Sequence, residues 1–184
     1  AYRMGLFPMA DSADSDAFYW YDPEVRGQLP IDHLHVSRSL KRLIRQKPFS
    51  LTIDQAFTEV IDGCAEATDE RPKTWINRPI RDMFIALHEA GHAHSVECWQ
   101  GDRLVGGLYG LAFGAAFAGE SMFSRVTGTS KVALVFLCAR LWKGGFTVLD
   151  TQFTNPHLMQ FGAYEITRSQ YKTRLTEAIF AEAD

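Results

Sequence analysis

HEAGHAHSVECWQGDRLVGGLYGLAFGAAFAGESMFS, residues 88–124, is the stretch that decides the fold of this chain. Polar and apolar residues alternate from His92 to Gln100, as they do in a half-buried strand. Gly101-Asp102 then forms a two-residue turn, and Arg103–Tyr109 returns as the second strand of a hairpin. A further strand is expected over Ala116–Met122. The stretch therefore predicts three consecutive strands.

The zinc-protease pattern H-E-x-x-H begins at His88. It binds zinc only when one helix carries both histidines on a single face. Here Asn77 can cap a helix with Pro79 in its first turn, and Gly91 stands where that helix is expected to end. His88 therefore ends a helix, whereas His92 begins a strand. A zinc metallopeptidase is a disfavoured alternative, and neither a metal nor a cofactor is expected.

The composition is that of an ordinary globular protein. Hydrophobic residues make up 46% of the 184 residues and charged residues 22%, which suits one core or two small lobes. No apolar run is long enough to span a bilayer, so no membrane partner is expected. Cys64, Cys98 and Cys138 lack metal-ligand spacing and are expected to be reduced thiols in the cytoplasm.

One predicted helix concentrates positive charge on one face, although the net charge of the chain is −3. Ser37 can cap this helix, and Leu40 and Leu43 face away from the basic side. The cations follow i, i+3, i+4, i+7 spacing and are Arg38, Lys41, Arg42 and Arg45. An ordinary solvated face explains such a stripe, but four cations without an interleaved acid also suit nucleic-acid phosphates.

A polar loop with a proline, Glu66–Lys73, is the expected boundary between two parts of the chain. Residues 1–66 are predicted to form a small N-terminal α/β lobe, with strands at Phe18–Tyr21 and Phe49–Ile53, and residues 67–184 a catalytic domain. After its three strands, this domain is expected to contain a helix over Ser130–Lys143, a strand over Thr147–Phe153, a short helix from Asn155 to Phe161, an extended segment at Ala163–Ile166 and a helix over Ser169–Phe180.

This order of elements resembles the core of GNAT acetyltransferases, so we expect an α+β fold with a GNAT-like C-terminal part. In that fold, a Gly-rich loop between a strand and a helix holds the pyrophosphate of acetyl-CoA through its amides. The corresponding junction, Ser124–Lys131, contains one glycine, Gly128. A GNAT-type N-acyltransferase that uses acyl-CoA is thus an alternative, and this loop disfavours it.

Nine short motifs, in an order that runs from Gly5 to Ala163, closely resemble leucyl/phenylalanyl-tRNA–protein transferases. They are GLFPM (5–9), HVSRS (35–39), TWI (74–76), GHAHSVE (91–97), VGGLYG (105–110), GESMFS (119–124), SKVAL (130–134), LDTQF (149–153) and HLMQFGA (157–163). The resemblance implies a cytoplasmic enzyme that transfers Leu or Phe, with Met as a third candidate, from aminoacyl-tRNA to proteins that begin with Arg or Lys. Such transfer marks proteins for the bacterial N-degron pathway. It also implies a further N-terminal segment before Ala1-Tyr2.

The resemblance assigns catalysis to Asp150 and Gln152. They are two apart in a predicted strand, so both side chains are expected on one face. Asp150 is expected to hydrogen-bond and polarise Gln152, whose carbonyl oxygen orients the attacking amine and assists its deprotonation. A polar pair that holds a loop is the structural alternative. A tRNA-binding module without catalysis is the alternative function, and it leaves these residues without a purpose.

Glu120 lies in an otherwise apolar run, where an acid is costly unless it is paired. The resemblance places the acid that binds the acceptor here, and the Arg or Lys at the substrate N-terminus is a suitable partner. An internal ion pair with Arg125 or Lys131 is the alternative.

The donor side chain needs an apolar pocket, which the resemblance assigns to Phe117, Met122 and Leu134. Methionine suits a pocket that accepts both a flat ring and a branched chain, whereas plain core is the alternative for each residue. Trp75 matches the tryptophan that stacks on the 3′-terminal adenine of tRNA. The best-known relatives have a second tryptophan where this chain has Met9, which is expected to pack on the base or ribose.

Overall fold

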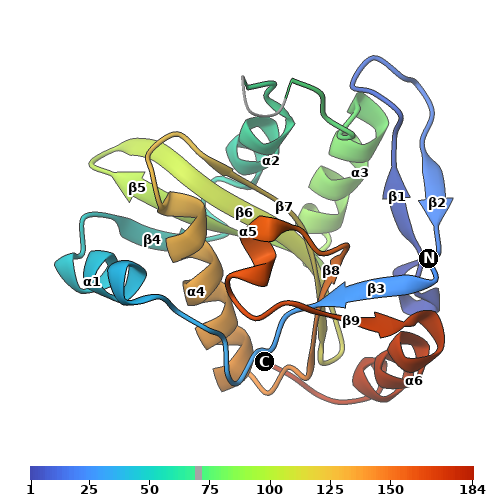
Figure 1. Cartoon of the computed structure of the whole chain (residues 1–184). Helices are drawn as coiled ribbons and strands as arrows, with labels where there is room; N and C mark the ends of the chain where they lie inside the picture. The colour runs from blue at the N-terminus through green and yellow to red at the C-terminus, as the bar shows by residue number, and fades with distance from the viewer. Residues whose placement is uncertain (69–71) are drawn as a thin grey trace.

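The computed structural model describes residues 1–68 and 72–184 of the protein (Figure 1). Residues 69–71, within the loop predicted to separate two lobes, lie outside the described part. In chain order the elements are η1 (Tyr2–Met4), β1 (Phe7–Met9), β2 (Tyr19–Tyr21), β3 (Val25–Gln28), α1 (Arg38–Gln46), β4 (Ser50–Ile53), α2 (Phe57–Ala65), α3 (Arg78–Glu89), β5 (Ala93–Gln100), β6 (Arg103–Phe113), β7 (Ala116–Ser124), α4 (Thr129–Lys143), β8 (Val148–Gln152), α5 (Pro156–Met159), β9 (Tyr164–Thr167) and α6 (Arg168–Ile179).

Seven strands of the described part form one mixed sheet in the order β4-β5-β6-β7-β8-β3-β9. Its neighbouring strands are antiparallel except β7 and β8, which run parallel and are connected through α4. Parallel neighbours need such a crossover, because a tight hairpin cannot join them. β1 and β2 form a separate antiparallel ribbon. The α+β class predicted from the sequence is confirmed.

Helices cover both faces of this sheet. Phe117 and Ala118 are neighbours on β7 but belong to different hydrophobic clusters, because successive strand residues point to opposite faces. The cluster of Ala118 includes side chains of α2, α3 and α6, and the cluster of Phe117 includes side chains of α1, α4 and α5. Figure 1 shows α4 lying across the sheet. The sheet is therefore buried between two layers of helices.

The hairpin predicted from residues 88–124 is confirmed. β5 and β6 pair antiparallel, with Gln100 opposite Arg103 at the turn. Ser37 and Asn77 are also confirmed as N-caps, and Asn155 caps α5, because each side chain accepts a hydrogen bond from a backbone N–H of the first turn.

The H-E-x-x-H pattern does not lie on one helix. α3 ends at Glu89, and Gly91 adopts a left-handed φ of 78° before β5 begins at Ala93. His88 lies in the last turn of α3, with its Nδ1 2.8 Å from the carbonyl oxygen of Ala93. The helix end expected at Gly91 is confirmed, whereas the strand begins one residue later than the expected His92. The two histidines consequently do not share the single helix face that a zinc protease requires.

Two strands were not predicted, and one of them, β3, shapes the centre of the molecule. β3 lies between β8 and β9, and β4 pairs with β5, so one sheet contains strands from both sides of residue 66. The division into residues 1–66 and 67–184 stays a prediction. In the part of the chain that the structure describes, no helix has the length and apolar character needed to cross a membrane.

Candidate active site

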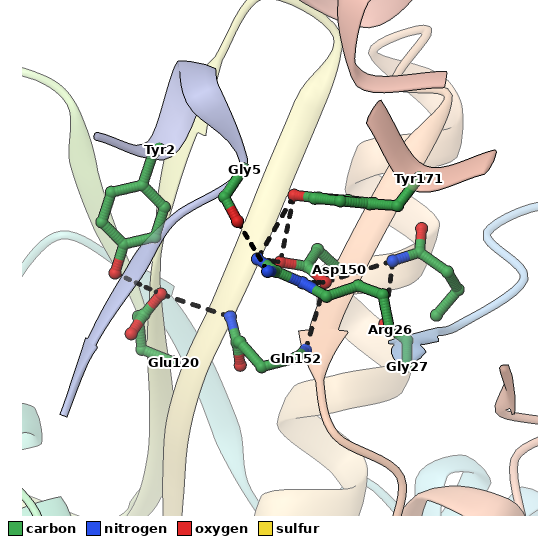
Figure 2. A network of polar contacts seen from close by, with 9 residues as sticks. Tyr2, Gly5, Arg26, Gly27, Glu120, Asp150, Gln152 and Tyr171 are labelled. Carbon is green, nitrogen blue, oxygen red and sulfur yellow. Dashed lines mark hydrogen bonds and ion pairs between the residues drawn. The ribbon is translucent and has the colours of Figure 1, made fainter. Parts of the chain in front are cut away.

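Residues from five separate segments meet where β7 and β8 stop pairing (Figure 2). The parallel register ends at Ala118 opposite Asp150, although β7 continues to Ser124. Two residues further along each strand, Glu120 and Gln152 lie side by side, with the Gln152 Nε2 3.4 Å from the Glu120 Oε1. The predicted catalytic pair and the predicted acceptor-binding acid are therefore brought together, and Tyr2, Arg26 and Tyr171 join them from η1, β3 and α6.

Asp150 is buried in a complete shell of donors. The Arg26 guanidinium donates from Nε to Oδ1 at 2.8 Å and from Nη2 to Oδ2 at 2.7 Å, a bidentate ion pair in which both side chains are 1% exposed. Gln28 donates to Oδ1 at 3.1 Å and the Tyr171 hydroxyl to Oδ2 at 3.3 Å. Burial alone lowers the pKa of Arg26, but the hydrogen bond and charge of Asp150 outweigh it, and that pKa is raised.

Asp150 contacts Gln152 through the backbone, not through the side-chain amide that the sequence analysis expected. The Gln152 backbone N–H donates to Asp150 Oδ1 at 3.1 Å, while the Gln152 side chain donates to Glu120. The reason is the left-handed backbone of Gln152, whose φ is 59°. This conformation ends the regular alternation of β8 and turns the amide toward β7.

Glu120 is partly buried and has no basic partner of its own among the ion pairs of the described residues. Its carboxylate accepts a 2.7 Å hydrogen bond from the Tyr2 hydroxyl. Burial raises the pKa of Glu120 to about 8, and the charge of Asp150 adds to the rise, while the Tyr2 hydrogen bond and the charge of Arg26 act against it. The site thus contains a desolvated acid beside a paired one.

The internal ion pairs considered for Glu120 are not formed. Arg125 donates to Glu66 at 2.8 Å, and Lys131 donates to the side-chain oxygen of Gln160 at 3.0 Å. Both cations are therefore engaged elsewhere.

Tyr2 and Arg26 were missed by the sequence analysis. Tyr2 is buried in edge contacts with Trp20 and Phe84, and burial followed by the charge of Glu120 raises its pKa well above the usual value. No strand was predicted at β3, so nothing singled out Arg26. The flanking residues, Glu24-Val25 and Gly27-Gln28, are mostly polar, so no local pattern indicated that Arg26 is buried.

The predicted donor-pocket residues lie together. Phe117, Met122 and Leu134 belong to one hydrophobic cluster, in which Phe117 and Leu134 are buried and Met122 is partly buried. They come from β7 and from the helix that follows it, α4. Their role as a pocket stays a prediction, because the same burial fits plain core.

The two segments that carry the predicted adenine-stacking residues, Met9 and Trp75, lie next to each other. The backbone N–H of Ala10, next to Met9, donates to the carbonyl oxygen of Trp75 at 3.3 Å. Both side chains are partly buried and pack on the same cluster. Each therefore keeps some exposed surface for a ligand.

The predicted phosphate-binding stripe is exposed on α1. Ser37 accepts from the backbone N–H of Leu40 at 3.3 Å, and Leu40 is buried against α4. Arg38, Lys41, Arg42 and Arg45 are all exposed.

Two hollows on the described surface share no residue with the polar network. One, of about 460 Å³, is lined by Glu59, Asp62, Arg103, Leu104, Val105 and Arg125. The other, of about 610 Å³, is lined by Arg168, Ser169, Lys172, Thr173 and Thr176. The site is therefore located by its buried charged residues, and not by a hollow in the surface.

Comparisons with known proteins agree with the motifs. The family described as leucyl/phenylalanyl-tRNA protein transferase matches residues 28–176, and the N-terminal domain of the same transferase matches residues 1–24. Leucyl/phenylalanyl-tRNA–protein transferases from Hyphomonas neptunium and Zymomonas mobilis are each 55% identical, over 100% and 97% of this chain and 71% and 67% of their own lengths. The one from Paramagnetospirillum magneticum is 57% identical over 97% of this chain and 86% of its own length.

Among solved structures, a conserved protein of unknown function from Bacteroides thetaiotaomicron covers 88% of this chain and 59% of its own, at 10% identity and a TM-score of 0.47. That likeness is too weak to support an argument. The sequence matches, in contrast, are strong enough to show the family. The chain belongs to the leucyl/phenylalanyl-tRNA–protein transferase family of aminoacyltransferases.

Proposed function

We propose that this chain transfers Leu or Phe, with Met as a third candidate, from aminoacyl-tRNA to the α-amino group of proteins that begin with Arg or Lys. In the cytoplasm of a bacterium, the products would enter the N-degron pathway. The observation that carries the acceptor assignment is Glu120, a desolvated acid without a basic partner beside the predicted catalytic residues.

An N-terminal Arg or Lys supplies the charge that Glu120 lacks. A nearby cation favours the ionised carboxylate, so binding of the acceptor lowers the pKa of Glu120 from about 8 and releases a proton near neutral pH. A guanidinium can engage a carboxylate through two hydrogen bonds, whereas an ammonium acts as a point charge. A neutral side chain does not favour the ionised carboxylate, so the proposed site disfavours it relative to Arg or Lys.

Gln152 is suited to orient the attacking amine. Its Nε2 donates to Glu120, which leaves its Oε1 to accept a hydrogen bond from the α-amino group of the acceptor. The aminoacyl ester is already activated, so alignment of the amine with the ester carbon supplies much of the rate. Asp150 and Gln152 form one unit, because the carboxylate accepts from the backbone of the amide residue.

The remaining assignments concern the donor. Phe117, Met122 and Leu134 hold the Leu or Phe side chain, Trp75 and Met9 pack on the 3′-terminal adenosine, and the cations of α1 contact tRNA phosphates. The clustering of the first three, the adjacency of the next two and the exposure of the stripe support these roles. A GNAT-like core is supported by the parallel β7–β8 pair, which is connected by α4 and preceded by the β5–β6 hairpin.

The test is transfer of labelled Leu from charged tRNA to a peptide that begins with Arg. We expect transfer to this peptide, and none to the same peptide when its α-amino group is acetylated. A peptide that begins with Ala tests the acceptor rule, and acetyl-CoA in place of charged tRNA tests the acyl-CoA alternative. Acetylation of the peptide without any transfer from tRNA would contradict the proposed function.

A further inference from the structure

Asp150 is too deeply buried to contact a substrate. It is 1% exposed, and both carboxylate oxygens already accept hydrogen bonds from protein donors. Two of those bonds come from one guanidinium, which also neutralises the charge. The carboxylate is thus fully used inside the fold, and removing its charge would leave a buried cation unpaired. Its influence on the reaction must pass through a neighbour.

Arg26 is held by further contacts besides its ion pair with Asp150. Its guanidinium lies 4.6 Å from the ring centroid of Phe7 and 4.3 Å from that of Tyr171. Nη1 also donates to the carbonyl oxygen of Gly5 at 2.7 Å. The planar group therefore contacts two aromatic rings. Figure 2 shows Tyr171 beside the guanidinium and the donors of Arg26 directed at Asp150.

The strand that carries Arg26 is built to approach the end of β8. Gly27 pairs with Gln152, and a Cβ added to Gly27 would lie 2.7 Å from the carbonyl carbon of Phe153. Only glycine permits this approach without a shift of backbone. Arg26 thereby reaches Asp150 from the strand that also pairs with Gln152.

Gln152 is the neighbour through which this arrangement acts. Non-glycine residues rarely adopt a left-handed φ such as its 59°, and they keep it only when their surroundings hold it. The hydrogen bond from its N–H to Asp150 Oδ1 does so, and the side chain then points to Glu120. Loss of the carboxylate's fixed position would free Gln152 to return to extended geometry.

We propose that Arg26 is a positioning residue for the transfer reaction, which acts through Asp150 to hold Gln152 in its left-handed conformation against Glu120. This inference rests on the proposed function and deepens it. Arg26 and Asp150 do not touch the substrate; Gln152 does. The charge of Asp150 is then needed to bind Arg26, and its acceptor oxygen is needed to hold Gln152.

The test compares Arg26→Gln, Asp150→Asn and the double variant Arg26→Gln/Asp150→Asn, in single-turnover transfer of Leu from tRNA to an Arg-starting peptide. Each single variant leaves a buried charge unpaired, and we expect transfer per folded protein to slow by roughly 100-fold, with affinity for charged tRNA within about twofold of the parent. The double variant removes both charges and keeps an oxygen that can accept from Gln152. We expect it to transfer at least roughly tenfold faster than Arg26→Gln.

A control away from the network is Arg81→Gln, which removes a bidentate but partly exposed arginine–aspartate pair, to Asp62, on α3 and α2. It is expected to transfer like the parent. If Arg26→Gln does not fold, the double variant and Arg26→Lys serve instead, and Arg26→Lys is expected to be slow but folded, since lysine keeps the charge and loses the fork.

The outcomes separate the two proposals. Transfer by the parent and equally by Arg26→Gln, per folded protein, would overturn this inference alone. So would a double variant no faster than the poorer single variant, because it would mean that the negative charge of Asp150 itself acts in the reaction. Absence of transfer by the parent would contradict the proposed function, and this inference with it.

Discussion

Two acids lie in one network of this protein and differ in almost everything else. Asp150 is matched by the guanidinium of Arg26, between the rings of Phe7 and Tyr171. Glu120 accepts hydrogen bonds from the Tyr2 hydroxyl and, at 3.4 Å, from the Gln152 amide, and burial raises its pKa to about 8. The charge of Asp150 is balanced inside the fold, whereas Glu120 mostly keeps its proton near neutral pH until a cation binds beside it. A paired buried acid is thus part of the framework, and an unpaired one marks a place for a ligand.

The largest expected effect follows from breaking the balanced pair. Asp150→Asn leaves the Arg26 guanidinium buried without a counter-charge, and we expect the free energy of unfolding to fall by about 3–5 kcal/mol. Glu120→Gln breaks no internal ion pair and should keep the stability of the parent at pH 7 or exceed it. Urea unfolding of both variants measures the contrast. Equal losses would show that the two acids do not differ as described.

The pH dependence of stability sharpens the same contrast. Burial raises the pKa of Glu120 from 4.5 to about 8 in the folded state. Between these values the folded protein holds a proton that the unfolded chain has lost, so stability falls as pH rises from about 4.5 to 8. Glu120→Gln should remove this fall. The measurement is the urea midpoint from pH 5 to 9 for parent and variant, and parallel curves would count against a titrating Glu120.

The cations of α1 differ from the two acids of the network, because they are exposed on the surface. No ion pair among the described residues includes Arg38 or Lys41, and both are exposed. Changing both to Gln should weaken tRNA binding and reduce the slope of log affinity against log salt by about 0.7–0.9 per lost phosphate contact. Lys143→Gln, at the exposed end of α4, is the control and should leave the slope unchanged. An unchanged slope in the α1 variant would place the tRNA elsewhere.

The smallest expected effect concerns metal. Because α3 ends before His92, the pattern that begins at His88 does not form the zinc-protease face. We expect chelators to leave transfer unchanged and purified protein to contain no stoichiometric zinc. One tightly held zinc per chain, lost together with activity, would refute this.

The sequence predicted the segments in which the site lies better than it predicted their contacts. Alternation in residues 92–109 and the turn at Gly101-Asp102 were enough for the hairpin, because both signals are local. β3 escaped prediction since it is short and pairs with strands more than a hundred residues away. Arg26, which β3 carries and which pairs with Asp150, was therefore not predicted.

The geometry of Gln152 shows the second limit of sequence reasoning. Period-two alternation placed Asp150 and Gln152 on one face, which suggested direct contact between their side chains. A left-handed backbone at Gln152 replaced that contact with a backbone hydrogen bond and sent the amide to Glu120. Such a conformation depends on tertiary partners, here β3 and Asp150, and local pattern does not encode them.

The central claim is that Glu120, whose pKa burial raises to about 8, takes its counter-charge from the positive side chain of the acceptor. The most direct test compares two peptides that differ only at their first residue, Arg or its neutral isostere citrulline, with the parent and with Glu120→Gln. We predict that the parent prefers the Arg peptide on the order of 100-fold or more in kcat/KM, and that Glu120→Gln loses most of this preference while still binding charged tRNA. The same preference in both proteins would contradict the account.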